Sequence, residues 1–231
     1  MKAPPAIEVL RRDGRKDRRR GMISKALLLI MEGSRRIGRL MPLRGEGRHA
    51  ANARRIPEES RGAVFIEDQE RLGELRYGAA TMRWSGCGPI AAANAMRALG
   101  REAYLPDVIG ELERDGAVFF GAGGTSPYAV RDLLERKGLG TWISTEEREF
   151  DEMLSQGDVF ILLFHFDRKK RLNLHYVCMT RQGKGFAVHN LSGRGRQAYV
   201  RGSFADMLDA MTGGKGRSVL LMRVSGDANA G

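Results

Sequence analysis

The stretch Trp84-Ser85-Gly86-Cys87-Gly88-Pro89-Ile90-Ala91-Ala92-Ala93-Asn94-Ala95-Met96 places a cysteine between two glycines at the start of an alanine-rich segment. Pro89 suits the first position of a helix, because its missing N–H is one of the donors left unpaired there. The sequence therefore predicts a helix from about Pro89 to Leu99, ended by Gly100. Cys87 then lies just before or at the N-cap, where the partial positive charge of the helix end favours a thiolate.

The residues around Cys87 allow two interpretations. Gly86 and Gly88 carry no side chains, so the backbone of a substrate has room to approach the sulfur. The alternative is that Cys87 is a small core residue, which is the commoner role of a lone cysteine. The second cysteine, Cys178, lies in the apolar run 176–179 and is predicted to be a core thiol. A base elsewhere in the chain, and a residue that orients it, would decide for the catalytic role of Cys87.

The positive charge of the chain is concentrated at one end. The formal net charge of the 231 residues is +11, and residues 1–62 hold 17 Lys and Arg against 7 Asp and Glu. The remaining residues are close to neutral, and the basic segment lacks interleaved aromatic residues, so no specific nucleic-acid binding is predicted. No apolar window is long enough to span a membrane, and no signal peptide is evident. A cytoplasmic protein is expected, with no disulfide framework.

Residues 1–62 are predicted to form a segment separate from the main domain. A basic tail is followed by an amphipathic helix at about 22–41 and by a linker over 42–62. The helix divides into an apolar side (Ile23, Leu27, Ile30, Ile37, Met41) and a charged side (Lys25, Glu32, Arg35, Arg36, Arg39). It is expected to pack on the domain or on a protein partner, with an anionic membrane surface as the alternative.

Residues 63–224 are predicted to form one α+β domain, followed by a flexible C-terminus at 225–231. Helices come first and strands later, with few alternating units, which is the pattern of this fold class. The expected helices cover 89–99, 106–114, 127–138 and 144–155, with a short one from 203; the expected strands cover 63–66, 159–164, 175–180, 185–190 and 218–224. The uniformly apolar run 159–164 predicts a strand buried on both faces. No metal or cofactor site is predicted, because the glycine-rich stretch 121–124 lacks the flanking features of a phosphate loop.

The candidate base comes from a predicted hairpin. A turn at Gln182-Gly183 sets His175 directly opposite Asn190, on the same face as Val177 and Val188. Opposed residues have Cβ atoms roughly 4.5–5.5 Å apart, which is close enough for the Asn190 amide to hold the imidazole. Of the other three histidines, His189 falls on the opposite face and is predicted to be structural, His165 is a strand end, and His49 lies in the linker. Cys87, His175 and Asn190 thus form a nucleophile, base and orienter, with a thiolate–imidazolium pair expected.

The chain order Cys, His, Asn resembles that of the papain-like cysteine peptidases. The resemblance is closer to their bacterial branch, which includes the leader-peptide-cleaving domains of bacteriocin exporters. It covers about residues 64–200 and is carried by Gln69, Tyr77-Gly78, Ser85-Gly86-Cys87-Gly88-Pro89, Gly124-Thr125-Ser126 and His175-Tyr176-Val177. The resemblance implies a helical half carrying the nucleophile helix, packed on an antiparallel sheet that carries the histidine and asparagine.

The resemblance also implies a role for each site residue. Cys87 would be the nucleophile, His175 the base and acid, and Asn190 the orienter, while Gln69 would donate to the oxyanion beside the Cys87 backbone N–H. Two departures stand out. In the exporter domains the glutamine lies a few residues before the cysteine, where this chain has Thr81 and Met82, and the third member is often Asp.

The expected function is therefore a thiol hydrolase that cleaves a peptide or amide bond through an acyl-enzyme. An acyltransferase or transglutaminase-like enzyme would use the same residues with an amine in place of water. A further alternative, which is not an enzyme, is a binding module that is tethered by the basic segment.

Overall fold

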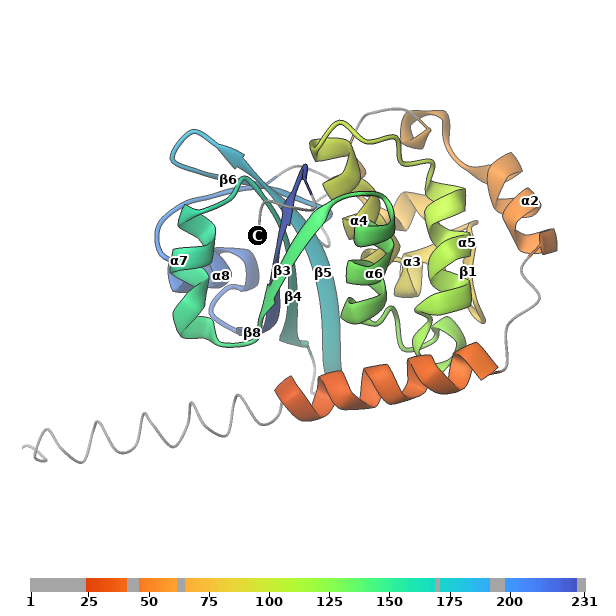
Figure 1. Cartoon of the computed structure of the whole chain (residues 1–231), viewed down its shortest axis with the longest axis horizontal. Helices are drawn as coiled ribbons and strands as arrows, with labels where there is room; N and C mark the ends of the chain where they lie inside the picture. Colours follow the sequence, from red (N-terminus) through yellow and green to blue (C-terminus); the bar gives the residue numbers. More distant parts are fainter. Residues whose placement is uncertain (1–23, 41–45, 62–64, 169–170, 192–197, 228–231) are drawn as a thin grey trace, which may run out of the picture.

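The computed structural model describes residues 24–40, 46–61, 65–168, 171–191 and 198–227. A mainly helical half comes first and an antiparallel sheet second, and the two halves lie side by side (Figure 1). The fold is α+β, which confirms the predicted class. Within the described ranges, every helix is too short or too polar to cross a membrane.

The helical half contains most of the short elements. Its members are α2 (Glu46–Arg55), η1 (Glu58–Ser60), η2 (Gln69–Leu72), β1 (Arg76–Tyr77), β2 (Ala80–Thr81), α3 (Met82–Ser85), α4 (Cys87–Ala98), α5 (Leu105–Asp115), η3 (Val118–Gly121) and α6 (Pro127–Arg136). Helix α4 is its centre, and its alanines at 91–93 and 95 are fully buried. Small side chains allow neighbouring elements to approach this helix closely on every side.

The second half is built on a six-stranded antiparallel sheet in the order β3-β8-β4-β5-β6-β7. The strands are β3 (Gly140–Ser144), β4 (Val159–Arg168), β5 (Arg171–Gln182), β6 (Gly185–His189), β7 (Ala198–Val200) and β8 (Gly216–Ser225), with η4 (Glu147–Glu149), α7 (Phe150–Ser155) and α8 (Phe204–Thr212) between them. The sequence did not predict β3 or β7. In the predicted helix at 144–155, only α7 and the turn η4 are helical.

Each face of the sheet covers a separate core. Ile161 and Leu163 of β4 belong to the core shared with α4, whereas Phe160 and Leu162 belong to the core under α7 and α8. This confirms that β4 is buried on both faces, as its uniformly apolar sequence predicted. The layers are therefore the helical half, the sheet, and the pair α7 and α8 (Figure 1).

The start of the domain is attached to α4 by a buried amide. The Asn94 side chain accepts from the Ile66 N–H and donates to the Ile66 carbonyl, both at 2.9 Å. The strand predicted over 63–66 is not formed at residues 65 and 66, and residues 63 and 64 lie outside the described ranges. The amide of Asn94 supplies the pair of hydrogen bonds that a neighbouring strand would otherwise make.

The N-terminal segment contains more structure than was predicted. Residues 24–40 are helical and run along the edge of the helical half (Figure 1). The expected linker at 42–62 is wrong for residues 46–60, which include α2 and η1, and Ile56 just after α2 is buried in the main core. The predicted basic tail lies outside the described residues, as do residues 228–231 of the predicted flexible C-terminus.

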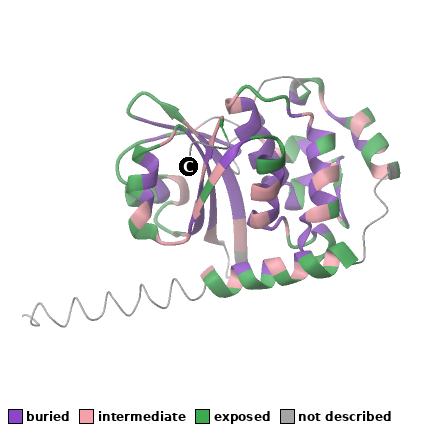
Figure 2. Cartoon of the chain, viewed as in Figure 1, coloured by how far each residue is buried: buried purple, intermediate pink, exposed green. Residues whose placement is uncertain are grey.

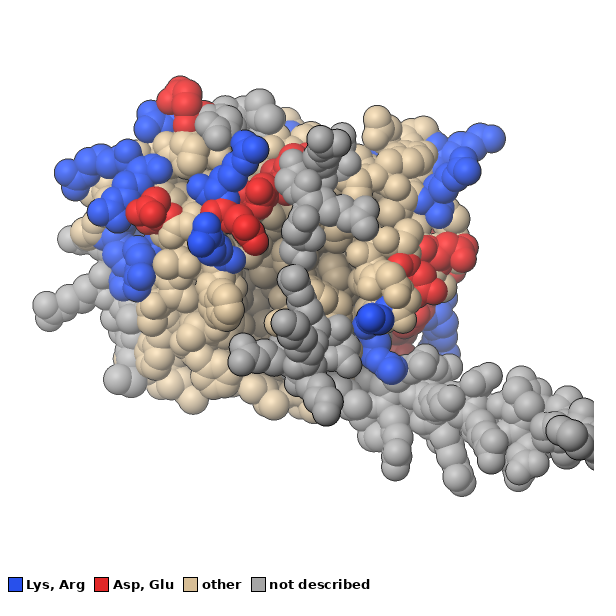
Figure 3. Space-filling view, turned by 180° about the vertical axis from the view of Figure 1, so that it is seen from behind, with Lys and Arg blue, Asp and Glu red and all other residues tan. Residues whose placement is uncertain are grey.

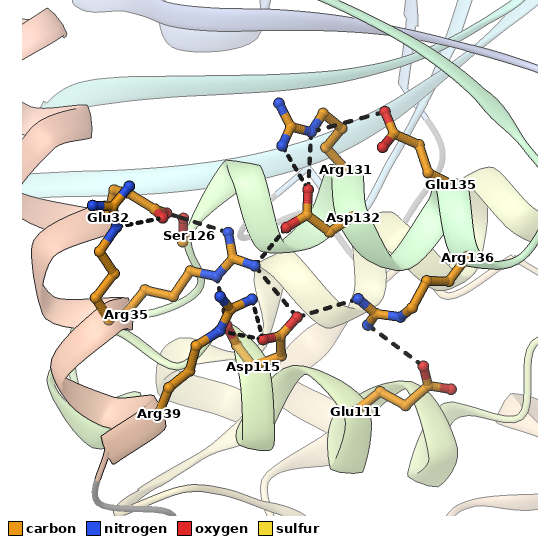
Figure 4. A network of polar contacts seen from close by, with 11 residues as sticks. Glu32, Arg35, Arg39, Glu111, Asp115, Ser126, Arg131, Asp132, Glu135 and Arg136 are labelled. Atoms are coloured by element: carbon orange, nitrogen blue, oxygen red, sulfur yellow. Dashed lines mark hydrogen bonds and ion pairs between the residues drawn. The ribbon is translucent and has the colours of Figure 1, made fainter.

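The helix at 24–40 contacts the domain through a buried arginine. The Arg35 guanidinium is 2% exposed and lies 2.6 Å from Asp132 Oδ2 and 3.3 Å from Asp115 Oδ2 (Figure 4). Its Nε also donates to the Asp115 backbone carbonyl at 2.6 Å. Burial alone lowers the pKa of Arg35, and the neighbouring carboxylates of Asp132, Glu32 and Asp115 outweigh that effect and raise it. Arg35 belongs to the predicted charged side of the helix, and it is nevertheless buried because its charge is paired inside the structure.

Candidate active site

Helix α4 begins two residues earlier than its proline suggested. Cys87 is its first residue, Gly86 is the N-cap, and Pro89 occupies the third position rather than the predicted first. The first intrahelical bond runs from the Ile90 N–H to the Gly86 carbonyl at 3.1 Å. The Cys87 side chain therefore starts inside the first turn, where backbone N–H groups are not used by the helix itself.

The two glycines that flank Cys87 are required for packing. A Cβ at Gly86 would lie 2.4 Å from the Met82 carbonyl oxygen, and one at Gly88 would lie 2.6 Å from the Thr125 Cβ. Neither distance is possible between real atoms, so both positions must stay unsubstituted. The interpretation that these glycines leave room for a substrate is wrong, because protein atoms occupy that space.

Thr125 fixes the start of α4 relative to the sheet. Its hydroxyl lies 2.8 Å from the Tyr77 hydroxyl, and its backbone carbonyl accepts from the Tyr176 hydroxyl at 2.9 Å. Both tyrosines are buried. Tyr176 follows His175 directly on β5, so this contact connects the support of the cysteine helix to the strand that carries the histidine.

The start of the cysteine helix contacts β5 beyond the point where β6 pairs with it. Strand β6 pairs with β5 along Cys178–Gln182, and among the described residues no strand pairs with β5 at 175–177 on that side. The Tyr176 backbone hydrogen-bonds to the Cys87 sulfur, as the backbone groups of Gly88 and Cys87 also do. The start of α4 therefore contacts β5 directly beside His175.

The hairpin register differs from the predicted one by two residues. Cys178 pairs with His189 and Met179 with Val188, because the two-residue turn is at Gly183-Lys184, with Gly183 at φ 58°. His175 is therefore not opposite Asn190 in the ladder. Asn190 follows the last residue of β6 and has φ 63°, in the left-handed region that asparagine tolerates better than most residues.

Asn190 still contacts His175, through its main chain rather than its amide. His175 Nε2 lies 2.6 Å from the Asn190 carbonyl oxygen. A carbonyl can only accept, so Nε2 carries the proton and Nδ1 keeps the lone pair that a base needs. The predicted orienting contact exists, but the left-handed backbone of Asn190 makes it in place of the side chain.

The Asn190 side chain binds Gln69 instead. Its Oδ1 accepts from the Gln69 backbone N–H at 3.0 Å, and its Nδ2 donates to Gln69 Oε1 at 3.2 Å. Gln69 Nε2 in turn donates to the Arg83 carbonyl at 2.7 Å, four residues before Cys87. Gln69, Asn190 and His175 thus form one network, whereas no hydrogen bond joins Cys87 to His175 in the described part of the chain.

A second pair, Glu67 and His189, supports this network and was missed in the sequence. His189 is fully buried, with Nδ1 2.7 Å from Glu67 Oε1 and Nε2 2.9 Å from the Thr180 hydroxyl. Glu67 Oε2 also accepts from the Asn190 N–H at 3.4 Å. The pair holds the segment before Gln69 against the end of β6. A contact between residues so far apart in the chain leaves no local signal, although His189 is structural, as predicted.

Burial favours the neutral forms of both reactive side chains. It raises the pKa of the Cys87 thiol, and the N–H groups of Tyr176, Gly88 and Cys87 oppose this without overcoming it. Burial also lowers the pKa of His175, and the bond to the Asn190 carbonyl acts weakly in the other direction. Both pKa shifts favour a thiol and a neutral imidazole over the thiolate–imidazolium pair expected from the sequence. Burial changes the pKa of Cys87 more than the N–H groups at the start of the helix do.

Neither reactive side chain is open to bulk solvent. Cys87 is 8% exposed and His175 is 4% exposed. Among the described residues, no group of three or more His, Cys, Asp or Glu side chains is arranged to hold a metal ion. The other thiol, Cys178, is buried in the main core as predicted, and burial raises its pKa.

Comparison with known proteins finds a similarity in structure and none in sequence. No family model and no curated protein sequence matches the chain. Among solved structures it is similar to the peptidase domain of Streptococcus ComA, a bi-functional ABC transporter involved in a quorum sensing pathway. The identity is 15%, the TM-score is 0.42, and the match covers 60% of this chain and 90% of that domain. The neighbour is of the class that the sequence resemblance named, and the case for function rests on the geometry of the site.

Proposed function

We propose that this protein is a cysteine peptidase or amidase that acts through an acyl-enzyme on Cys87. One observation carries the proposal: the Cys87 sulfur contacts the Tyr176 backbone, directly beside a histidine whose Nε2 is bonded to a carbonyl. That bond leaves Nδ1 of His175 as the proton acceptor. A thiol, a neutral imidazole and a fixed tautomer are the components of nucleophilic catalysis on an acyl group.

Acylation begins from the neutral pair. His175 Nδ1 takes the thiol proton as the sulfur forms a bond to the substrate carbonyl carbon, and the carbonyl oxygen becomes an oxyanion. The imidazolium then donates this proton to the leaving nitrogen, and the carbon–nitrogen bond breaks. The products of this step are a free amine and a thioester on Cys87.

Deacylation uses the same groups with water. His175 Nδ1 accepts a proton from water, whose oxygen attacks the thioester carbon, and the thiolate leaves and regains the proton from the imidazolium. The products are a carboxylic acid and the free thiol. In the alternative reaction an amine replaces water and the product is a new amide.

The oxyanion has two candidate donors. The Cys87 backbone N–H lies at the start of α4. Gln69 Nε2 has two hydrogens, and the bond to the Arg83 carbonyl uses one of them. We assign the second hydrogen to the oxyanion, where one such donor contributes about 3 kcal/mol to lowering the barrier.

The experiment presents the protein with a mixed peptide library and identifies cleaved products by mass spectrometry, with and without an added amine. We expect cleavage that is lost in Cys87→Ser and reduced about 100-fold or more in His175→Ala, because a general base contributes a factor of this size. His49→Ala is the matched control, since His49 lies on the surface beside Asp107. Products that carry the added amine would assign acyl transfer in place of hydrolysis.

A second measurement needs no substrate. Alkylation of Cys87 by iodoacetamide near neutral pH is expected to be slower in His175→Ala than in the unaltered protein and unchanged in His49→Ala, because only His175 is proposed to take the thiol proton. An alkylation rate unchanged in His175→Ala, together with no cleaved peptide, would refute the proposed activity.

A further inference from the structure

The helix at 24–40 packs on the domain through a side that includes a charged residue, while most of its large apolar side chains face solvent. Its inward residues are Leu28 and Met31, each 3% exposed, and the charged Arg35. Four large apolar side chains remain in solvent: Leu29 at 74%, Ile30 at 56%, Ile37 at 59% and Leu40 at 83% exposed. Figure 2 shows this helix as largely exposed along its outer side. A helix that buries a guanidinium and leaves its aliphatic residues in water presents an apolar surface outward.

Two phenylalanines beside this helix add to the apolar surface. Phe119 and Phe120 have φ of 47° and 55°, a left-handed conformation that side chains with a Cβ avoid, and both rings are partly exposed. The conformation is held from both ends. The Phe119 N–H donates to the Ser34 hydroxyl at 2.7 Å, and the Phe120 carbonyl accepts from the Ala79 N–H at 2.8 Å. Backbone strain that turns two rings toward solvent is typical of binding surfaces.

The helix and the phenylalanines enclose a shallow apolar hollow. It has a volume of about 320 Å³ and is lined by Ile30, Ile37, Gly33, Gly38, Phe119 and Phe120. The glycines open it, because a larger side chain at either position would project from the same side of the helix. Contiguous exposed apolar surface of this kind marks an interaction site.

The charged residues near this apolar surface indicate what binds to it. Lys25 is 61% exposed and Arg36 is 76% exposed, on the same helix as the apolar residues, and each forms one ion pair at the surface, with Glu146 and Glu32 respectively. The ten residues 11–20, which precede the helix in the chain, contain seven Lys and Arg and two Asp. Apolar residues bordered by basic ones match an anionic lipid surface, where headgroups attract the cations and the apolar side chains enter the interface.

The charge distribution also argues against other occupants. A second copy of this chain would bring together two segments of the same positive sign. On the face seen in Figure 3, by contrast, basic and acidic side chains lie intermixed rather than forming a separate basic surface. We propose that the surface formed by Leu29, Ile30, Ile37, Leu40, Phe119 and Phe120 docks this protein on an anionic membrane surface. The proposal is independent of the proposed enzymatic activity.

The test is sedimentation of the full chain with vesicles of phosphatidylcholine, with or without about a third phosphatidylglycerol. We expect binding to the anionic vesicles alone, weakened at least tenfold in Ile37→Asp and clearly weakened in Phe119→Ser. Tyr199→Ser is the matched control, because Tyr199 is 52% exposed on β7, at the opposite edge of the sheet from β3. Circular dichroism and thermal unfolding of each variant check that the helix and domain remain folded.

Three results would overturn the proposal. One is no binding of the unaltered protein to anionic vesicles. Another is equal binding by the unaltered protein, Ile37→Asp and Phe119→Ser, which would leave the basic residues alone responsible. The third is a dimer in lipid-free solution that Ile37→Asp abolishes, which would make a second copy the occupant. Phe119→Ser, on a separate element, keeps the test decisive if Ile37→Asp disturbs the helix.

Discussion

Helix α4 and the helix at 24–40 are held in place by different forces. Helix α4 is buried on every side, and its alanines and glycines allow close contact with Thr125, Met82 and the sheet. The helix at 24–40 buries only two apolar side chains, is otherwise held by polar contacts centred on the Arg35 guanidinium between two carboxylates, and leaves most of its large aliphatic side chains in water. Close packing of this kind fixes a position finely, whereas a few charged contacts fix an orientation while keeping a surface free.

This difference matches what each helix is proposed to do. The first turn of α4 presents a sulfur to one backbone N–H on β5, and an error of an ångström there would break that contact. The helix at 24–40 has only to display an apolar surface. Three changes test this contrast, from the largest expected effect to the smallest.

Replacing Arg35 by Ala should release the helix at 24–40. The change removes the cation that Asp115 and Asp132 share and leaves each with a more exposed arginine, and we expect the docked position to lose about 2 kcal/mol, because hydrogen bonds between charged groups contribute about 1.5–3 kcal/mol. Hydrogen exchange is expected to quicken at residues 24–40 and to stay slow in α4. Arg36→Ala, at an exposed position, is the control. Unchanged exchange at residues 24–40 in Arg35→Ala would show that the apolar contacts of Leu28 and Met31 suffice.

One identical substitution in both helices should give opposite results. Gly88→Ala forces a Cβ into Thr125 and should destabilise the fold by roughly 1–3 kcal/mol. It should also slow alkylation of Cys87. Gly33→Ala meets nothing within 4 Å and should be neutral or stabilising by up to about 1 kcal/mol, through helix propensity alone. Urea unfolding of both variants measures the difference, and equal losses would contradict the contrast.

Acidification should produce a smaller change that is specific to the site. Burial lowers the pKa of His175 below its ordinary 6.5, so the unfolded chain binds a proton more readily than the folded one. Stability is therefore fully present above pH 6.5 and falls as the pH drops through the folded-state pKa. The urea midpoint measured between pH 7 and pH 5 should fall in the unaltered protein and fall less in His175→Gln.

The acid effect can be assigned to His175 by its pH range. Hydrogen bonds and charges from Arg35, Arg39, Arg131 and Arg136 hold the pKa values of Asp115 and Asp132 below 3.8 despite some burial. Those carboxylates lose stability only at lower pH. His49→Gln should keep the full dependence between pH 7 and pH 5, and a dependence unchanged in His175→Gln would point to another group.

Local sequence patterns determined the fold class and the identities of the main site residues. The order of helices and strands predicts α+β, and the uniformly apolar 159–164 predicts a strand buried on both faces. The same patterns singled out Cys87, His175 and Asn190, the family resemblance added Gln69, and the structure brings the last three into one hydrogen-bonded network. These features are readable because each depends on neighbours within a few residues or on the period of a single element.

Only the tertiary structure decided how those residues act on one another. The register of the β5–β6 hairpin depends on which residues form its turn, and a shift of two preserved the shared face while removing the predicted pair. The left-handed backbone of Asn190 then supplied the contact to His175 through its carbonyl. The charge state of Cys87 depends on burial by distant segments, which outweighs the helix end that the sequence displays.

For the helix at 24–40, too, the sequence showed the pattern of side chains and the tertiary structure decided their contacts. Its amphipathic pattern was evident from residues 22–41, but which side packs inward depended on Asp115 and Asp132, which lie far along the chain. A sequence records which side chains share a helix face, since that follows from 3.6 residues per turn. It does not record which partner each face meets, because the energy of a charge or an apolar side chain is set by the surroundings that the whole fold assembles.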